Sequence, residues 1–246
     1  MGNVIVAGGA TGIGRAAVRG FRARGDNVLL VDHRPQTADL LTEEAPGKIR
    51  FVQRDLIEPE APAATVQEAL DTFGSLDTVL VTAALMLSAP LKDWTPDMWD
   101  RSVALNLRMP FLYAQAAAPH LAKSPNASII LISSTGAIRG HAGMSDYQAT
   151  KAALPGLCRS LTAELGPLGI RINTILPGWI DTPFNDPFWQ YQPNPEARRE
   201  EIERQIPLRR QGQPDEVSSM VLFLASPAGR YIAGSSIVID GGYTAV

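Results

Sequence analysis

Hydrophobic positions along the chain follow two different patterns. Short runs in which nearly every residue is apolar recur at intervals, and the longer stretches between them have the three-to-four-residue spacing of an amphipathic helix. The short runs predict strands buried on both faces, since a half-exposed strand would alternate apolar and polar residues. Seven strands are expected, over Asn3–Ala7, Asn27–Asp32, Ile49–Gln53, Asp77–Val81, Ser128–Ile132, Arg171–Leu176 and Ser236–Asp240.

Proline and glycine residues indicate where the intervening helices begin and end. Proline fits the first turn of a helix, and glycine favours the left-handed backbone just past its last turn. The predicted helices run over Gly12–Arg24, from Pro62 to the residue before Gly74, from Thr95 through an interruption at Pro110, over Asp146–Leu165, and over Pro214–Ala225.

Nearly all-apolar strands that alternate with helices are typical of a parallel sheet covered on both faces. Crossovers between such strands are right-handed, which leads to a doubly wound arrangement. The sequence therefore predicts an α/β protein, a single-domain Rossmann fold with a doubly wound seven-stranded parallel sheet and helices on both faces, over residues 1–246. One irregular stretch, Asp181–Pro195, is rich in proline and aromatic residues and is expected to form a lid.

Composition narrows the functional classes. The 246 residues include 45% hydrophobic side chains and carry a net charge of −3, without a basic patch for nucleic acid. No apolar run approaches the roughly 18 residues that span a membrane, and no signal peptide is expected. The single cysteine, Cys158, allows no intrachain disulfide, and no clustered His, Asp and Glu suggest a metal site. We expect a cytoplasmic protein with a small-molecule substrate and with neither a nucleic-acid nor a membrane partner.

The first strand leads into a glycine-rich loop, Gly8-Gly9-Ala10-Thr11-Gly12-Ile13-Gly14, and a helix follows. Glycines let the backbone turn tightly and approach a pyrophosphate, which the free N–H groups of the helix N-terminus then bind. A glycine cluster alone is often only a turn, but this one has the required strand before it and helix after it. We therefore expect a dinucleotide site.

The second strand ends in Asp32, eighteen residues past Gly14. A carboxylate there accepts hydrogen bonds from the ribose hydroxyls of NAD and repels the 2′-phosphate of NADP. Arg34 lies two residues on and suits NADP, so NAD is the expected cofactor and NADP the alternative. Asp55, at the end of the third strand, is a candidate for the adenine rim or merely a strand cap.

Tyr147 and Lys151 are four residues apart on one predicted helix and share a face of it. A tyrosine with a pKa near 10 carries protons poorly at neutral pH unless a cation stabilises its phenolate, and Lys151 would supply that charge. Ser134 lies just past the fifth strand, at the edge of the sheet where such folds bind ligands. A Tyr-x-x-x-Lys pair alone is common by chance, so this interpretation rests on the combination.

Together these motifs resemble the short-chain dehydrogenase/reductase family over essentially the whole chain. The loop Gly8–Gly14 matches the family's Gly-x-x-x-Gly-x-Gly motif, and the order and spacing of Ser134, Tyr147 and Lys151 match its Ser…Tyr-x-x-x-Lys set. The remaining matches are Asn106, which completes the family tetrad, Pro177-Gly178 on the nicotinamide side, and the C-terminal Asp240-Gly241-Gly242.

The resemblance implies a mechanism and an assembly. Tyr147 would be the general acid or base, Lys151 would lower its pKa and bind the nicotinamide ribose, and Ser134 would orient the substrate carbonyl. Asn106 would hold a water in a proton relay to Lys151, and the protein would form a homotetramer or homodimer. The expected cofactor-binding residues are Gly8, Thr11, Gly12, Ile13, Gly14, Asp32, Asp55, Leu56, Ala83, Ala84, Tyr147, Lys151, Pro177, Gly178, Ile180 and Thr182.

Three features depart from the family pattern. Ala7 replaces a usual Thr, and Thr82-Ala83-Ala84-Leu85 replaces Asn-Asn-Ala-Gly after the fourth strand. We expect Ala7 to lie beside Thr82 and Ala83, with a polar contact exchanged for apolar packing, and Leu85 to add bulk near the nicotinamide ribose. Pro155 cannot donate to the carbonyl of Lys151, so a bend is expected in that helix.

Substrate-binding residues are expected in the loops after strands four, five and six. The assigned substrate residues are Ser134, His141, Tyr147, Phe184 and Trp189, and further candidates are Leu85, Met86, Ile138, Met144, Phe188 and Tyr191. The lid aromatics would either cap a substrate or pack on the core. Cys158 is expected to be a buried thiol rather than a nucleophile.

Three functions remain open from the sequence. The first is hydride transfer between NAD(H) and a secondary alcohol or ketone, such as a polyol, a sugar or another small hydroxy compound. The second is an NADPH-dependent 3-oxoacyl-[acyl-carrier-protein] reductase, for which Arg198, Arg199, Arg209 and Arg210 would form a basic docking surface. The third, a non-catalytic nucleotide-binding protein, is disfavoured because all four residues of the catalytic set are present.

Overall fold

Seven parallel strands form one sheet in the computed structural model, which describes residues 2–35 and 38–246. Their order across the sheet is β3-β2-β1-β4-β5-β6-β7. The strands are β1 (Asn3–Ala7), β2 (Asn27–Asp32), β3 (Ile49–Gln53), β4 (Thr78–Val81), β5 (Ser128–Ile132), β6 (Arg171–Pro177) and β7 (Ser236–Ile239). All seven predicted strands are therefore confirmed, and no boundary is displaced by more than one residue.

Nine α-helices occur in the described part of the chain. They are α1 (Gly12–Ala23), α2 (Ala38–Thr42), α3 (Ala61–Phe73), α4 (Pro96–Val103), α5 (Met109–Leu121), α6 (Ser145–Leu165), α7 (Asp186–Tyr191), α8 (Pro195–Gln205) and α9 (Pro214–Leu224). The predicted helices are confirmed, whereas α2, α7 and α8 were not expected. Helix α8 begins at an Asn194 cap, whose side chain accepts a hydrogen bond from the Ala197 N–H.

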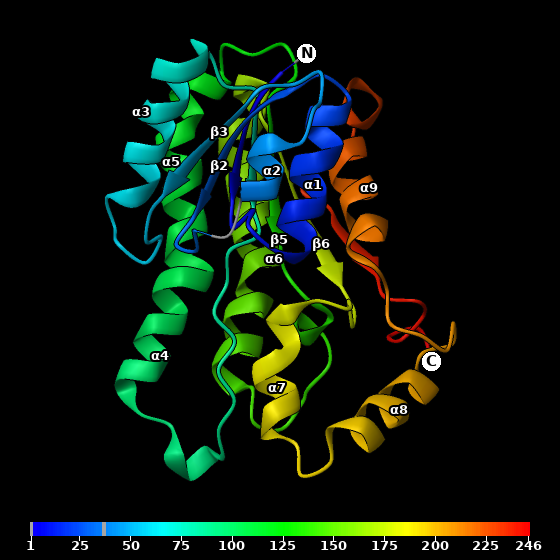
Figure 1. Cartoon of the computed structure of the whole chain (residues 1–246). Helices are drawn as coiled ribbons and strands as arrows, with labels where there is room; N and C mark the ends of the chain where they lie inside the picture. Colours follow the sequence, from blue (N-terminus) through cyan, green and yellow to red (C-terminus); the bar gives the residue numbers. More distant parts are fainter. Residues whose placement is uncertain (1, 36–37) are drawn as a thin grey trace.

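Helices cover both faces of the sheet (Figure 1). On one face, α1 and α9 pack side chains such as Phe21 and Val221 against β1 and β2. On the other face, α3, α5 and α6 bury Tyr113 and Leu154 against β4 and β5. The central strands are apolar throughout because both of their faces are covered, and the predicted doubly wound Rossmann fold is confirmed.

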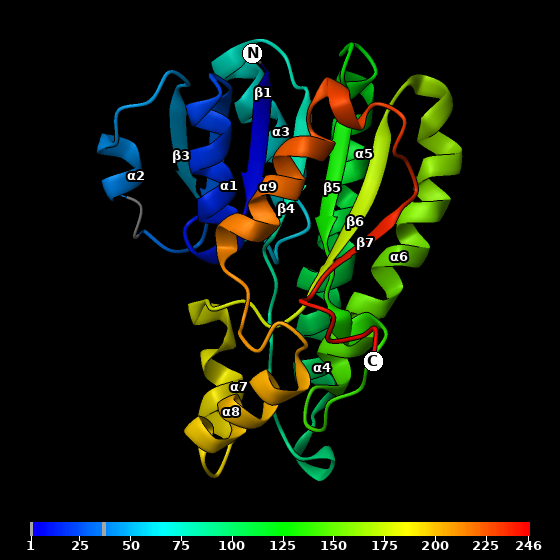
Figure 2. The ribbon, with the colours of Figure 1, turned by 90° about the vertical axis from the view of Figure 1, so that its right-hand side faces the viewer.

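The strand order places the ligand-binding edge. The chain runs outward from β1 to β2 and β3 on one side and returns to β4 on the other, so the loops after β1 and β4 diverge. This divergence leaves a crevice at the carboxyl ends of the strands, where open α/β sheets bind ligands. Helices α7 and α8 lie beyond this same edge (Figure 2).

A turn of π-helix joins α4 to α5. It covers Ala104–Arg108, and α5 begins at Met109 with Pro110 in its first turn. Pro110 has no N–H to donate to the carbonyl of Asn106, and the Met109 N–H donates five residues back, to Ala104. The predicted interruption at Pro110 is confirmed. The π-helical turn that forms it contains Asn106. No helix among the described residues is long and apolar enough to cross a membrane.

Candidate active site

A cavity of about 1280 Å³, partly open to solvent, lies at the carboxyl ends of β1, β4, β5 and β6. Its lining runs from the glycine loop and Asp32 to Phe184, so one cavity joins the places where a dinucleotide and a substrate would bind. Most of the predicted site residues line it, namely Gly8, Thr11, Gly12, Ile13, Gly14, Asp32, Asp55, Leu56, Ala83, Ala84, Ser134, His141, Tyr147, Lys151, Pro177, Gly178, Ile180, Thr182 and Phe184. Two do not, Asn106 and Trp189.

The glycine loop has no room for side chains. A Cβ at Gly14 would lie 2.2 Å from the carbonyl oxygen of Gly8, and one at Gly8 would lie 2.4 Å from the Ala83 nitrogen. Gly8 also has φ +91°, a conformation that other residues rarely adopt. The N-cap of α1, Thr11, makes no side-chain cap, so the first N–H groups of the helix remain available to an anion. This backbone cradle fits the pyrophosphate of a dinucleotide.

Asp32 lies at the end of the cavity nearest β2 and is fixed by backbone donors. Its carboxylate accepts hydrogen bonds from the Ala10 N–H at 3.0 Å and the Arg34 N–H at 3.0 Å. The Arg34 guanidinium also lines the cavity and donates to the Thr11 hydroxyl at 3.3 Å. An acidic and a basic side chain therefore flank the place where the adenosine ribose of a dinucleotide would bind.

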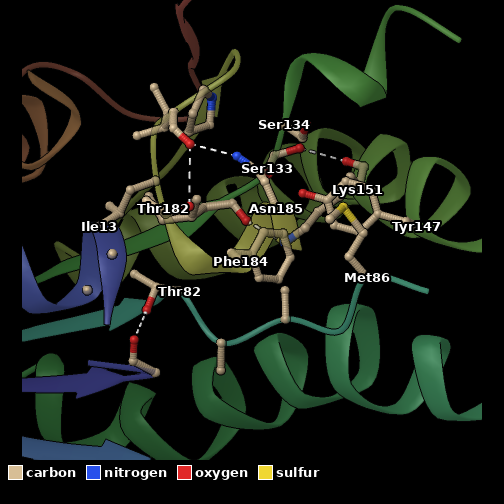
Figure 3. Close-up of a pocket in the computed structure, with 18 of the residues that line it drawn as sticks. Ile13, Thr82, Met86, Ser133, Ser134, Tyr147, Lys151, Thr182, Phe184 and Asn185 are labelled. Atoms are coloured by element: carbon tan, nitrogen blue, oxygen red, sulfur yellow. Dashed lines mark hydrogen bonds between the residues drawn. The ribbon is translucent and has the colours of Figure 1, made fainter. Parts of the chain in front are cut away.

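Tyr147 and Lys151 lie on consecutive turns of α6 and face the cavity, with Ser134 opposite them at the end of β5 (Figure 3). The Lys151 ammonium donates to the Ile132 carbonyl at 2.8 Å and lies 5.6 Å from the centre of the Tyr147 ring. The Ser134 hydroxyl accepts a hydrogen bond from the Gly136 N–H at 3.0 Å. The fold thus brings together three residues that are up to seventeen positions apart in the sequence.

Burial perturbs both titratable members of this set. Loss of solvent raises the pKa of Tyr147 to about 12, although the nearby Ser134 hydroxyl acts to lower it. Loss of solvent also lowers the pKa of Lys151 to about 7. Strongly shifted pKa values inside a cavity are typical of functional sites.

Asn106 lies behind the cavity wall. Its side-chain oxygen accepts from the Leu85 N–H at 2.7 Å, and its amide donates to the Leu85 carbonyl at 2.8 Å and to the Thr150 hydroxyl at 3.1 Å. It therefore ties the loop after β4 to α6, one residue before Lys151. Leu85 is held through its backbone and, contrary to expectation, is not among the residues that line the cavity.

The substrate end of the cavity is largely aromatic and apolar. Met86, Met144 and Phe184 line it, and the Phe184 ring lies 5.9 Å from that of Tyr147. His141 also lines it and packs edge-on against Trp179 at 5.5 Å. Burial, together with the charges of Arg139 and Arg198, lowers the pKa of His141, which keeps the imidazole neutral at pH 7.

The lid aromatics divide into two groups. Trp189 does not line the cavity, and it packs against Trp179 at 5.3 Å and Phe188 at 5.0 Å. Trp179 lines the cavity instead, and sequence analysis missed it although it directly follows the Pro177-Gly178 turn. Gln148 and Asn185 also line the cavity and were missed. Of the other candidates, Phe188 is buried, whereas Ile138 is 60% exposed and Tyr191 is 40% exposed.

Comparisons with known proteins agree with this geometry. The family model described as "Enoyl-(Acyl carrier protein) reductase" matches residues 8–244. The chain is 32% identical to 3-oxoacyl-[acyl-carrier-protein] reductase of Thermotoga maritima, over 97% of this chain and 96% of that protein. It is 33% identical to L-rhamnose 1-dehydrogenase (NAD(P)(+)) of Azotobacter vinelandii, over 97% and 95% respectively. The solved structure of Thermoplasma acidophilum aldohexose dehydrogenase is similar with a TM-score of 0.89 and 28% identity, over 99% of this chain and 94% of that chain.

The chain belongs to the short-chain dehydrogenase/reductase family. It is therefore an NAD(P)-dependent oxidoreductase that interconverts an alcohol and a carbonyl group. The expected family, fold and enzyme class are confirmed. Among the residues that the structure describes, no cluster of His, Cys, Asp and Glu could hold a metal ion.

Ala7, where the chain departs from the short-chain dehydrogenase/reductase pattern, lies beside the residues that directly follow β4. As expected, Ala7 lies beside Thr82 and Ala83, whose N–H groups both donate to its carbonyl at 2.9 Å. The Ala7 side chain is fully buried in an apolar core cluster against which Ala83 packs, as expected. The Thr82 hydroxyl donates to the Gly8 carbonyl at 2.6 Å and approaches the Ala7 carbonyl at 3.0 Å, so a hydroxyl still fixes the start of the glycine loop.

Proposed function

We propose that this protein is an NAD-dependent dehydrogenase of small, neutral secondary alcohols, such as a polyol or a sugar. The observation that carries the proposal is the single cavity that brings the Asp32 carboxylate, the glycine cradle and the Tyr147–Lys151 pair together. When bound, NAD would supply the hydride acceptor. The residues of the chain would orient the alcohol and move its proton.

Tyr147 is the proposed proton carrier. Its buried phenol would accept the alcohol proton during oxidation and return it during reduction. Lys151 would favour the phenolate by its positive charge and would bind the nicotinamide ribose through its ammonium. Ser134 would hold the substrate oxygen beside the phenol. Asn106 does not line the cavity, so it would act indirectly. Its hydrogen bonds would hold the loop after β4 and Thr150 in place.

The NAD preference is proposed from the position of Asp32. Its carboxylate lines the cavity, where a 2′-phosphate would meet its negative charge. Arg34 lies close enough to offset part of this repulsion, so residual use of NADP is consistent with the proposal.

The proposal of a small, neutral polyhydroxy substrate rests on the residues at the substrate end of the cavity. Its neutral His141, Gln148 and Asn185 can hydrogen-bond hydroxyl groups, and its apolar side chains exclude water. Relatives named for rhamnose and aldohexose support a polyhydroxy substrate.

The alternative carrier-protein substrate has weaker support. Of the four arginines that would dock a carrier, Arg198 pairs with Glu201 and Arg210 with Glu216, each at 2.7 Å. Arg199 lies over the Trp189 ring at 5.1 Å, and Arg209 donates to a backbone carbonyl. Their charges are therefore engaged within the protein. Because the chain is related to the Thermotoga maritima reductase, the experiment below also tests this alternative.

We also propose that residues 1–246 act as one catalytic domain in a cytoplasmic homotetramer or homodimer. The buried thiol of Cys158 fits a reducing compartment. Trp99 on α4 and Phe111 on α5 are 44% and 41% exposed, and such apolar side chains on neighbouring helices support association.

The test is NADH or NADPH formation, followed by absorbance, on a panel of secondary alcohols, polyols and sugars. Reduction of acetoacetyl thioesters or crotonyl thioesters is expected with neither NADH nor NADPH, and consumption of both reduced cofactors with these acceptors is measured in parallel. Strong NAD-linked oxidation of a polyol or sugar would support the proposal. Silence on the whole alcohol panel, with NADPH-linked reduction of the acetoacetyl thioester, would replace it by the reductase. Tight NADH binding without any turnover would favour a non-catalytic role.

A further inference from the structure

Helix α6 contains a proline one turn after Lys151, and this proline leaves a carbonyl without its helical donor. Pro155 has no N–H, so the carbonyl of Lys151, four residues earlier, cannot receive the usual bond. The helix nevertheless continues from Ser145 to Leu165. Because Lys151 is only 3% exposed, its carbonyl needs a donor from within the protein.

Ser133 supplies that donor. Its hydroxyl donates to the Lys151 carbonyl at 2.8 Å, and the contact is visible beside Ser134 in Figure 3. Ser133 is only 2% exposed, although it is also one of the residues that line the cavity. The hydrogen bond crosses from the end of β5 to the middle of α6 and joins residues eighteen positions apart.

Lys151 is therefore held at both of its ends by two adjacent residues, Ile132 at the end of β5 and Ser133 directly after it. The Ser133 hydroxyl binds its carbonyl, and the Ile132 carbonyl accepts from its ammonium at 2.8 Å. The next residue along the chain is Ser134, and the next turn of α6 toward its N-terminus carries Tyr147. A shift of α6 against β5 at this point would move the Lys151 ammonium relative to the Tyr147 ring.

We propose that Ser133 is a positioning residue for Lys151, whose hydroxyl replaces the helical donor that Pro155 removes. The inference rests on the proposed role of Lys151 in proton transfer. It makes Ser133 and Pro155 a coupled pair: the hydroxyl is needed only because residue 155 is a proline. An alanine at position 155 would restore an N–H four residues after Lys151 and make the hydroxyl dispensable.

The test is a double-mutant cycle on Ser133→Ala and Pro155→Ala in the full chain. Ser133→Ala is expected to lower kcat about 10- to 100-fold, the range in which a small misplacement of a catalytic group falls. Pro155→Ala and the double variant are expected to stay within about twofold of wild type, since the restored N–H binds the carbonyl. Ser128→Ala is the matched control: it removes another buried β5 hydroxyl, which lies 3.5 Å from the Leu224 carbonyl and outside the cavity.

A pH profile separates positioning from loss of stability. If the Lys151 ammonium is displaced, it stabilises the Tyr147 phenolate less, and the rise of alcohol oxidation with pH should move to higher pH in Ser133→Ala. Adding Pro155→Ala should return the profile to its wild-type position. A variant that was merely less stable would lose active protein without moving the profile.

The variant Lys151→Met distinguishes the proposed role of Lys151 in proton transfer from the proposed role of Ser133 in positioning it. Wild-type turnover by Lys151→Met would overturn the role of Lys151 itself. An inactive Lys151→Met together with a fully active Ser133→Ala would overturn only the inference about Ser133. If Ser133→Ala does not fold, the double variant decides: folding with near-wild-type kcat supports the pairing, and an inactive or unfolded double variant overturns it.

Discussion

The ammonium nitrogen of Lys151 lies 5.6 Å from the centre of the Tyr147 ring, one turn away along α6. Both residues are buried, and Lys151 forms no ion pair among the salt bridges of the described residues. The burial that raises the pKa of Tyr147 to about 12 also lowers that of Lys151 to about 7. In the cofactor-free protein, burial therefore disfavours the charged form of both groups, and an ammonium and a phenolate formed together would stabilise each other.

This cost predicts how stability changes with pH in the cofactor-free protein. Below pH 7, Lys151 is protonated in both the folded and the unfolded chain, and the full cost of its burial is present. Between pH 7 and the ordinary lysine pKa of 10.5, only the unfolded chain holds the proton, so stability rises with pH. Relative to Lys151→Met, the wild-type melting temperature should gain a few degrees between pH 7 and about 9.5. Parallel melting curves for the two proteins across this range would contradict the lowered pKa.

The cofactor preference should depend on the charge of Asp32. Asp32→Asn keeps the shape of the side chain but removes the repulsion toward a 2′-phosphate, and Arg34 remains beside it. The ratio of kcat/KM for NAD to that for NADP should fall at least about tenfold. Adding Arg34→Leu should reverse the gain with NADP. An unchanged ratio in Asp32→Asn would show that this carboxylate does not set the preference.

Trp179 and Trp189 should respond differently to the same substitution. Trp179 lines the cavity, so Trp179→Leu should raise the substrate KM about tenfold and leave NADH binding intact. Trp189 is 7% exposed and packs behind Trp179, so Trp189→Leu should chiefly lower the melting temperature by several degrees. Steady-state kinetics and thermal unfolding of both variants check this assignment, which would be wrong if Trp189→Leu alone changed KM.

Much of the fold could be predicted because its signals are local. The strands are nearly all-apolar runs, and Pro62, Pro110 and Pro214 lie in the first turns of the helices they were expected to begin or interrupt. The glycine loop could be predicted equally well, because Gly8 and Gly14 belong to a local sequence motif. The structure has no room for a side chain at either position.

The parts that could not be predicted depend on contacts between distant segments. The sequence places Thr82 beside Ala7, but nothing in it indicates that the Thr82 hydroxyl donates to the Gly8 carbonyl, 74 positions away. The same is true of the Ser133 hydroxyl, whose partner is 18 positions away on another element. Trp189 was assigned to the substrate because the composition of the lid does not reveal which aromatic side chains face the cavity.

The role of Tyr147 is tested most directly by Tyr147→Phe, which removes only the hydroxyl. The account predicts that alcohol oxidation falls by at least about 10²- to 10⁴-fold, the usual contribution of a general acid or base. Binding of NADH, measured by fluorescence titration, should change less than about threefold, because the ring and the glycine cradle remain. Turnover that survives in Tyr147→Phe with wild-type kcat would contradict the assignment of Tyr147 as the proton carrier.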